Sequence, residues 1–173
     1  MSASTSIRRS KALNVTATGE GEAYWFWGNL VVVRSPEGSL PVVLEMRLPA
    51  GSAAPLHVHE RLEDNWYVRS GTIAVRDGDE TALVHAGDYL TTRRGVAQTH
   101  FVLEGPAELL QLHANTDFLD YVKQFGEPAT DRSRPPTEPL DMARAGEIAK
   151  ATGQPVIGPP MTEAEARTIA QRR

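Results

Sequence analysis

The stretch Pro55–Gly71, PLHVHERLEDNWYVRSG, combines two histidines with an acidic pair and an apolar run. His57 and His59 are separated by one residue. Alternate residues of a β-strand share a face, so both imidazoles point the same way if this segment is extended. Because imidazole nitrogen is a common ligand of transition metals, the pair is a candidate metal site. The same pattern also suits an exposed polar patch on an ordinary strand.

The acid that accompanies the histidines is selected by the face on which it lies. Trp66 and Val68 are the more natural inward pair of the next strand, and Asp64 shares their face. Glu63 lies on the other face. Two histidines and one carboxylate on facing strands suit non-haem Fe(II), and also Mn, Ni, Co or Zn, with open positions left for a substrate or oxygen. The sequence therefore predicts Asp64 as the third metal ligand and places Trp66 and Val68 in the substrate pocket.

The composition limits the kinds of partner and ligand. The 173 residues include 18 basic and 22 acidic side chains, a net charge of -4, which gives no basis for nucleic acid or an anionic membrane as partner. The chain has no cysteine, so a metal must be held by histidine, carboxylate, amide or backbone oxygen. No apolar run approaches the roughly 20 residues of a membrane span, and the first residues lack the apolar segment of a secretory signal. We therefore expect a cytoplasmic protein that binds neither nucleic acid nor membrane.

Short apolar runs separated by turn residues fill the chain from about residue 24 to residue 113. Gly, Pro and Asp-Gly pairs break these runs, and the DGDE sequence at Asp77–Glu80 is typical of a tight hairpin turn. Many short β-rich runs of this kind predict a sandwich or a barrel. The expected fold class is therefore all-β.

The C-terminal part of the chain has a helical pattern instead. Residues 118–126 and 140–153 space their apolar residues as helices do, and each segment ends at a glycine. Thr162 and Glu165 form a capping-box pair before a short terminal helix. The expected organisation is a disordered N-terminal tail at residues 1–13, a barrel with its following helix at 14–126, and a Pro-rich connector with helices packed on the barrel at 127–173.

The wider spacing of the histidine stretch resembles the first sequence motif of the cupins. Gly51, His57, His59 and Gly71 match the glycines and histidines of that motif, and its acid falls on Asp64, with six residues between it and the final glycine. The family normally has glutamate at this position. An aspartate, which is shorter, would have to lie closer to the metal or reach it through water.

The second cupin motif resembles the sequence from Gly87 onwards, with two departures. Gly87 and Gly95 are in register, but Arg93 stands where proline is usual and Gln98 stands where the third histidine ligand is usual. His100 lies two residues further on, and a β-bulge would be needed to bring it to the ligand position. The resemblance thus makes Gln98 either a weak oxygen ligand of the metal or a hydrogen-bonding wall of the pocket.

The resemblance covers most of residues 20–161 and is closest to small bacterial cupins of the quercetin dioxygenase-like group. In that group a helix ending in a Gly-Glu-Pro turn follows the barrel, and a Gly-Pro-Pro element lies near the end, as in this sequence. The resemblance implies a cupin barrel, also called a double-stranded β-helix or jelly roll, with a short C-terminal helical appendage. It also implies a homodimer formed through the edge strands of the barrel.

The resemblance further implies a metal-dependent enzyme, of the dioxygenase type, that acts on a small aromatic, flavonoid-like or polyketide-like molecule. In this hypothesis Asp64 takes a proton from the bound hydroxyl, and Gln98 and His100 complete the site as ligand or as donor to the substrate. The missing third histidine leaves two alternatives open. One is an isomerase or cyclase with a weak metal or none, in which His100 is the general base. The other is a non-catalytic cupin that binds a small molecule.

Other polar and aromatic residues have simpler interpretations. His113 is expected to be exposed or at a strand edge, and His85 is expected at the surface. Trp25, Phe26 and Trp27 are expected to pack in the core or to cover the mouth of the barrel.

Overall fold

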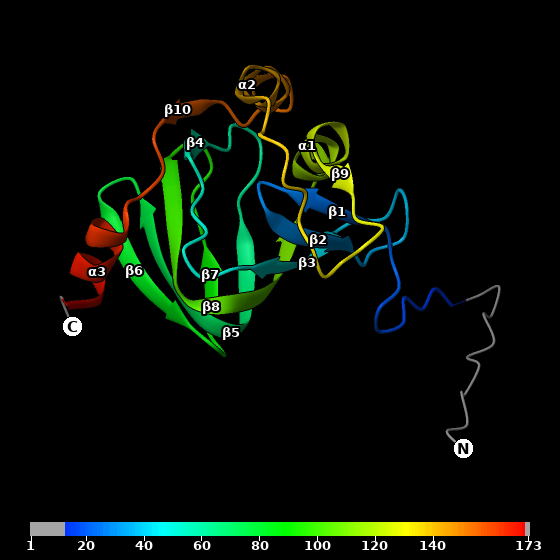
Figure 1. Cartoon of the computed structure of the whole chain (residues 1–173), viewed down its shortest axis with the longest axis horizontal. Helices are drawn as coiled ribbons and strands as arrows, with labels where there is room; N and C mark the ends of the chain where they lie inside the picture. The colour runs from blue at the N-terminus through cyan, green and yellow to red at the C-terminus, as the bar shows by residue number, and fades with distance from the viewer. Residues whose placement is uncertain (1–12, 172–173) are drawn as a thin grey trace.

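Alternating apolar and polar residues build the wall of a barrel within residues 13–171, the part of the chain that the computed structural model describes (Figure 1). In β3 (Val42–Leu48) every second side chain from Val42 to Leu48 is buried, whereas Arg47 between them is exposed. The buried side of each strand faces the interior because removing apolar surface from water is the main source of folding free energy. The expected disordered tail lies, apart from Leu13, outside the described residues.

All strand pairs in the described chain are antiparallel. The strands before β8 are β1 (Ala23–Phe26), β2 (Asn29–Val33), β3, β4 (Leu56–Val58), β5 (Asn65–Asp77), β6 (Glu80–His85) and β7 (Tyr89–Thr91). They are followed by β8 (Ala97–His113), β9 (Glu127–Pro128) and β10 (Val156–Gly158). The helices are α1 (Asp117–Phe125), α2 (Met142–Ala151) and α3 (Glu163–Gln171).

The long strand β8 connects the parts of the sheet. Its first residues pair with β4, most of its length pairs with β5, and its second half pairs with β3. One path of paired strands therefore runs β10-β4-β8-β3-β2-β1-β9, and β5 joins it through β8 and carries β6 and β7. β8 thus brings one end of β4 and one end of β5 to the same side of the barrel.

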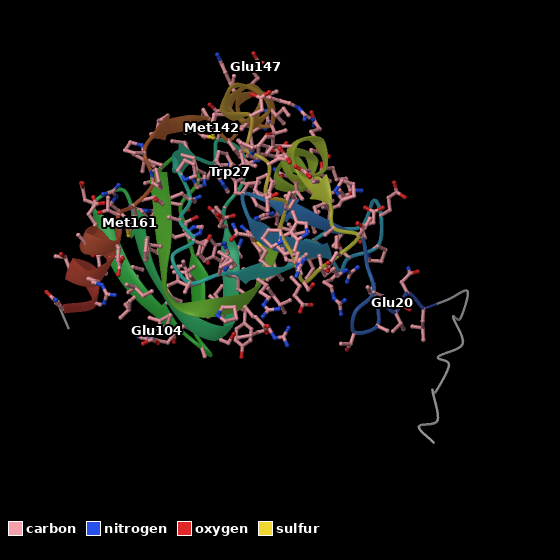
Figure 2. All side chains as sticks on the ribbon, in the orientation of Figure 1. Glu20, Trp27, Glu104, Met142, Glu147 and Met161 are labelled. Carbon is pink, nitrogen blue, oxygen red and sulfur yellow. The ribbon has the colours of Figure 1, made fainter. Side chains whose placement is uncertain are left out.

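The helices pack on the barrel at two places (Figure 1). α1 places an apolar face against the barrel, and its rings at Phe118 and Tyr121 lie 5.6 and 4.8 Å from the ring of Phe26 in edge-to-face contacts. α3 lies on the outer face of the sheet, where Ala166 packs in a cluster with Phe101 of β8. Figure 2 shows the side chains that fill the interior, with Trp27 on the side of the barrel that α1 and α2 cover.

Most of the expected elements are confirmed. The structure has the all-β barrel with a helical appendage, and Asp77 pairs with Glu80 across the predicted hairpin turn. α1 and α2 begin and end within two residues of the expected positions, and α3 follows the expected Thr162–Glu165 capping box. The apolar runs on either side of Gly105 form one continuous strand, β8. No helix among residues 13–171 has the length and apolar character needed to span a membrane.

Gly71, within β5, has both a left-handed backbone and a close neighbour. Its φ is +86°, and a Cβ added there would lie 2.7 Å from the Cα of Ala107 and 2.6 Å from the carbonyl oxygen of Glu104. We expect Gly71→Ala to lower the free energy of unfolding by about 3 kcal/mol, because the strained backbone and the overpacking each cost about 1–3 kcal/mol. Urea denaturation measures this change.

The matched control for Gly71→Ala is Gly146→Ala in α2. A Cβ at Gly146 meets no atom within 4 Å, and alanine is the better helix former by about 1 kcal/mol. This variant should be as stable as the wild type or more stable. Equal unfolding midpoints for the two variants would contradict the expectation.

Candidate metal centre

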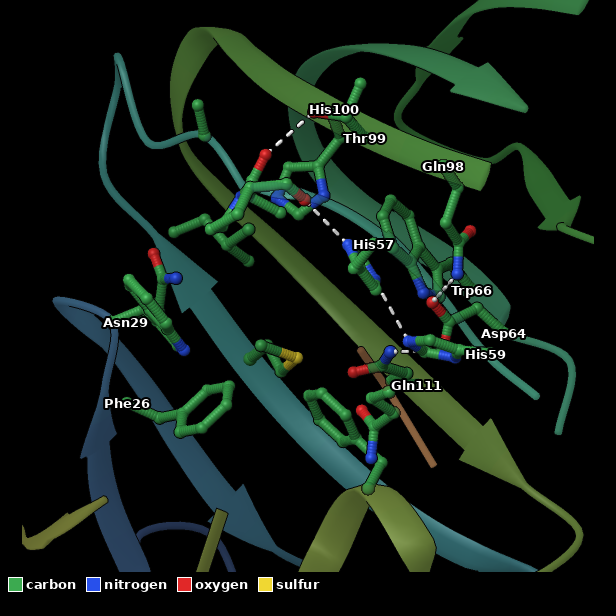
Figure 3. Close-up of a pocket in the computed structure, with 18 of the residues that line it drawn as sticks. Phe26, Asn29, His57, His59, Asp64, Trp66, Gln98, Thr99, His100 and Gln111 are labelled. Atoms are coloured by element: carbon green, nitrogen blue, oxygen red, sulfur yellow. Dashed lines mark hydrogen bonds and ion pairs between the residues drawn. The ribbon is translucent and has the colours of Figure 1, made fainter. Parts of the chain in front are cut away.

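A cavity lies inside the barrel and is walled mainly by apolar side chains (Figure 3). In Figure 3, His57, His59, Asp64, Gln98 and Trp66 gather on one side of the cavity, and Phe26 and Asn29 lie on the other. No lysine or arginine is found among the described residues that line it. The apolar lining includes Phe26, Trp27, Met46, Leu48, Trp66, Val75, Leu109 and Phe118.

The two histidines are held by β4 and the residue that follows it. His57 pairs in register with Gln98 of β8, and β10 pairs with β4 on its other side through Val156. The Nε2 atoms of His57 and His59 lie 3.0 Å apart. Two ligands bonded at about 2.1 Å to one ion at a right angle are about 3.0 Å apart, so this separation fits a shared metal ion.

The tautomer of His57 is set by the backbone. Its Nδ1 lies 2.7 Å from the carbonyl oxygen of Pro55, which can only accept, so Nδ1 carries the proton and Nε2 carries a lone pair. Nδ1 of His59 is shielded from solvent, has no hydrogen-bond partner among the described residues, and lies 3.4 Å from Oδ1 of Asp64. If that nitrogen carries a proton toward the carboxylate, the lone pairs of the two Nε2 atoms face each other. A cation between them resolves this repulsion, so the residues fit a metal ion.

Asp64 is the buried member of the acidic pair, and Glu63 is exposed, as the face argument predicted. Oδ1 of Asp64 accepts hydrogen bonds from Nε2 of Gln111 and from Nε2 of His113, both at 2.8 Å. Oδ2 accepts one from Nε2 of Gln98 at 3.2 Å. His57, His59 and Asp64 form a group that can hold a metal ion, with one ligand atom from each residue within 4.8 Å of the others.

The buried surroundings change the protonation of these groups. Burial lowers the pKa of His57, and the Pro55 carbonyl offsets part of this effect. Burial also lowers the pKa of His59 to about 4, although Asp64 acts in the opposite direction. Burial raises the pKa of the Asp64 carboxyl, but the His59 and His113 imidazoles lower it more, so it lies below its usual range. At neutral pH the site therefore contains neutral imidazoles and a carboxylate, the forms that bind metal ions.

Gln98 and His100 both lie in the cavity wall. The register between β5 and β8 continues without a shift from Val102 to Gln98, so no β-bulge brings His100 to the position of a third histidine ligand. Gln98 directs its amide nitrogen to Asp64, which is consistent with a hydrogen-bonding wall of the pocket. His100 packs edge-to-face against Trp66 with ring centroids 5.2 Å apart.

Two cavity nitrogens lack partners. Nε2 of His100 and Nε1 of Trp66 are shielded from solvent and have no hydrogen-bond partner among the described residues. Buried polar atoms without partners are uncommon, and a ligand that supplies polar atoms can satisfy both. Val68, which the sequence analysis placed in the pocket, is fully buried in the hydrophobic core and is not among the residues that line the cavity.

The prediction that His113 is exposed or at an edge is wrong. Its side chain is fully buried and contacts Asp64, as does the side chain of Gln111 on the same face of β8. Leu109 lies on the same face and is also buried, but Leu110 and Leu112 on the other face leave no sequence signal that selects the inward face. His85 is half-buried and lies 3.3 Å from the hydroxyl of Thr72.

Trp27 lines the cavity and donates its Nε1 hydrogen to the hydroxyl of Tyr121 at 3.2 Å, so the expected packing or covering role applies to it.

Other cavity residues from outside the histidine motifs were not identified from the sequence. Gln154 and Val156 reach the cavity from the C-terminal part of the chain. No local motif marks these residues, because they meet only through the long-range pairing of the strands.

Comparisons with known proteins support the fold. The model of the Cupin domain family matches residues 44–113. KdgF from Halomonas sp. superposes with a TM-score of 0.51 at 16% identity, over 58% of this chain and 92% of that one. A predicted oxalate decarboxylase from Thermotoga maritima superposes with a TM-score of 0.51 at 18% identity, over 59% of this chain and 98% of that one. The nucleoside dehydratase Pac13 of Streptomyces gives a TM-score of 0.50 at 18% identity, over 59% of this chain and 82% of that one.

The sequence has no significant match among functionally curated proteins. At these identities the solved structures support the fold and not an activity. The matched segment of this chain, residues 44–113, contains His57, His59, Asp64, Gln98 and His100. Residues 44–113 therefore match the Cupin domain family, and the chain has the cupin β-barrel fold.

Proposed function

We propose that this protein is a metal-dependent cupin enzyme that acts on a small organic molecule. The observation that carries the proposal is the pair of Nε2 atoms 3.0 Å apart at His57 and His59. The backbone fixes the tautomer of His57, and Asp64 favours the matching tautomer of His59, so both lone pairs are directed at one point. A divalent ion such as Fe, Mn, Ni, Co or Zn fits this donor set.

The bound ion would act as a Lewis acid that lowers the pKa of a substrate hydroxyl. The residues of this chain bind and orient the substrate beside it. Trp66 offers its unpaired indole N–H to a substrate oxygen, and His100 offers a second polar contact. Asp64 supplies negative charge beside His59, and Gln98 donates a hydrogen bond to one of its oxygens.

We propose a dioxygenase-type reaction on an aromatic, flavonoid-like or polyketide-like molecule. The apolar cavity, with Phe26, Trp66 and Phe118 in its walls, supports a flat apolar substrate. The lack of lysine and arginine among the described lining residues favours an uncharged substrate over a dicarboxylate. The resemblance to quercetin dioxygenase-like cupins supports the same choice. A cytoplasmic homodimer remains part of the proposal.

A non-redox isomerase or cyclase is the second candidate. It is favoured by His100, whose Nε2 lies in the cavity without a partner. Burial lowers the pKa of His100 to about 4, so the imidazole is neutral at pH 7 and can accept a proton. A non-catalytic cupin that binds a small molecule is the third candidate, and the unpaired cavity nitrogens suit it equally well.

The test combines metal loading with a substrate screen. Tag-free protein is loaded separately with Fe(II), Mn, Co, Ni and Zn, and bound metal is measured by mass spectrometry. Oxygen uptake is then followed with a panel of flavonols and simpler hydroxylated aromatics. We expect close to one metal per chain and oxygen uptake that depends on that metal.

The outcomes separate the candidates. Metal-dependent conversion of a substrate without oxygen uptake would replace the dioxygenase with the isomerase or cyclase. Failure to bind any of the five metals would exclude the metal-dependent enzyme and leave a metal-free enzyme or a binding protein centred on His100.

A further inference from the structure

We propose that Asp64 acts on the metal site through His59, as a hydrogen-bond acceptor for Nδ1, and that three side chains of β8 hold it in this role. The proposal rests on the metal site described above and deepens it. It makes the two imidazoles the protein ligands of the ion and makes Asp64, Gln98, Gln111 and His113 positioning residues. The evidence is which nitrogen of His59 and which oxygen of Asp64 faces each neighbouring side chain.

The first observation concerns the two edges of the His59 ring. Its Nε2 faces Nε2 of His57 at 3.0 Å, and its Nδ1 faces Oδ1 of Asp64 at 3.4 Å. The two nitrogens of an imidazole point in different directions, so an ion at Nε2 and a carboxylate at Nδ1 lie on different sides of the ring. A carboxylate that accepts from Nδ1 fixes the tautomer in which the Nε2 lone pair is free for a metal.

The second observation concerns the partners of the carboxylate. Oδ1 of Asp64 already accepts from Gln111 and His113 at 2.8 Å, and Oδ2 accepts from Gln98 at 3.2 Å. All three donors lie on one strand, β8, and their side chains are at most 3% exposed. Turning the carboxylate toward the ion would break hydrogen bonds that water cannot replace. The three hydrogen bonds therefore favour an Asp64 carboxylate that keeps its position beside His59 and does not turn toward the ion.

The third observation is the unsatisfied state of His59. Its Nδ1 is shielded from solvent and has no hydrogen-bond partner among the described residues. Asp64 is the carboxylate beside it, and a small approach from 3.4 Å closes a normal hydrogen bond. A proton on Nδ1 then has its acceptor, and Nε2 has its ion. Both nitrogens of His59 have partners only when Asp64 accepts from Nδ1 and does not bind the ion itself.

The test uses Zn²⁺ as a diamagnetic probe and two measurements other than activity. The dissociation constant is measured by competition with a chromophoric chelator. The histidine side-chain tautomers and the His59 Nδ1–H proton are followed by ¹H–¹⁵N NMR of the zinc-loaded protein. We expect Gln111→Met and Asp64→Asn each to weaken zinc binding by about 10–100-fold, the usual effect of losing such an outer partner. In both variants zinc should remain bound through Nε2, and the His59 Nδ1–H resonance should move.

Three further variants keep the test specific. Gln154→Met changes a buried glutamine of the same cavity that donates to the carbonyl of Asp117 and not to Asp64, so it should change neither reading. His113→Phe should weaken zinc binding, and His113→Gln, which keeps a donor, should restore most of the affinity. Thermal unfolding of each metal-free variant identifies any that fails to fold.

Two results would overturn the inference while leaving the metal site intact. One is complete loss of zinc in Asp64→Asn, equal to the loss in His59→Ala, which would make Asp64 a direct ligand. The other is a His59 Nδ1–H resonance that does not respond to Asp64→Asn. Failure of the wild type to bind zinc or any other metal is a different result, because it would remove the proposed function as well.

Discussion

The double variant His57→Ala, His59→Ala is expected to bind no metal, whereas the wild type binds close to one ion per chain. The two Nε2 atoms 3.0 Å apart are the donors that converge on one point, and the chain has no cysteine to replace them. A carboxylate engaged by three donors cannot hold a transition metal alone. Metal content is measured by mass spectrometry after loading and gel filtration.

The control for this loss is His85→Ala. His85 is half-buried, contacts Thr72 and does not line the cavity, so this variant should keep the full metal content. Metal retained by the double variant would show that the ion binds elsewhere on the protein. Circular dichroism of the double variant establishes that it is folded, because the removal of two polar side chains from the cavity wall should leave the strands in place.

Acid is expected to destabilise the metal-free protein between about pH 6.5 and pH 4. Burial lowers the pKa of His100 to about 4 and that of His59 to about 4, from an unfolded value of 6.5. In this interval the unfolded chain binds more protons than the folded one, so the free energy of unfolding falls as the pH falls. Each histidine contributes about 2–3 kcal/mol between pH 7 and pH 4.5, from 1.36 kcal/mol per pKa unit. Urea denaturation at the two pH values measures the difference.

One substitution isolates the contribution of a single histidine to this loss of stability in acid. His100→Gln removes a group that titrates in the interval, so its loss of stability between pH 7 and pH 4.5 should be smaller than that of the wild type by about 2 kcal/mol. Asp64 contributes in a different interval: its pKa is lowered, so the stability it provides is lost only below its usual pKa of about 4. Identical pH profiles for His100→Gln and the wild type would show that His100 is not held in its neutral form.

Much of the fold was predictable because turn residues separate the short apolar runs and because strands such as β3 alternate in burial. The face argument chose Asp64 over Glu63 correctly, since the pattern continues through the buried Trp66 and the exposed Tyr67. The positions of the motif glycines were equally informative: Gly71 has a left-handed backbone and a neighbour that excludes any side chain. These features are local, and local features can be seen in a single sequence.

His113 shows why the rest could not be predicted. The second half of β8 has leucines on both faces, with Leu109 on one and Leu110 and Leu112 on the other. The pattern alone does not decide which face points inward. The decision comes from the pairing of this segment with β3 on one side and β5 on the other, which turns Gln111 and His113 to the interior. Sequence periodicity cannot provide that long-range information.

The matched cupin domain and the cavity do not coincide along the chain. Residues 44–113 carry both histidines and the four-residue network around the acid. Other residues that line the cavity come from segments before and after the domain: Phe26, Trp27 and Asn29 before it, and Phe118, Tyr121, Gln154 and Val156 after it. The candidate metal ligands thus lie within the matched segment, whereas part of the cavity lining is encoded outside it. The flanks can diverge and change what fits the cavity while the metal-binding strands stay unaltered, so relatives that share only the domain need not share a substrate.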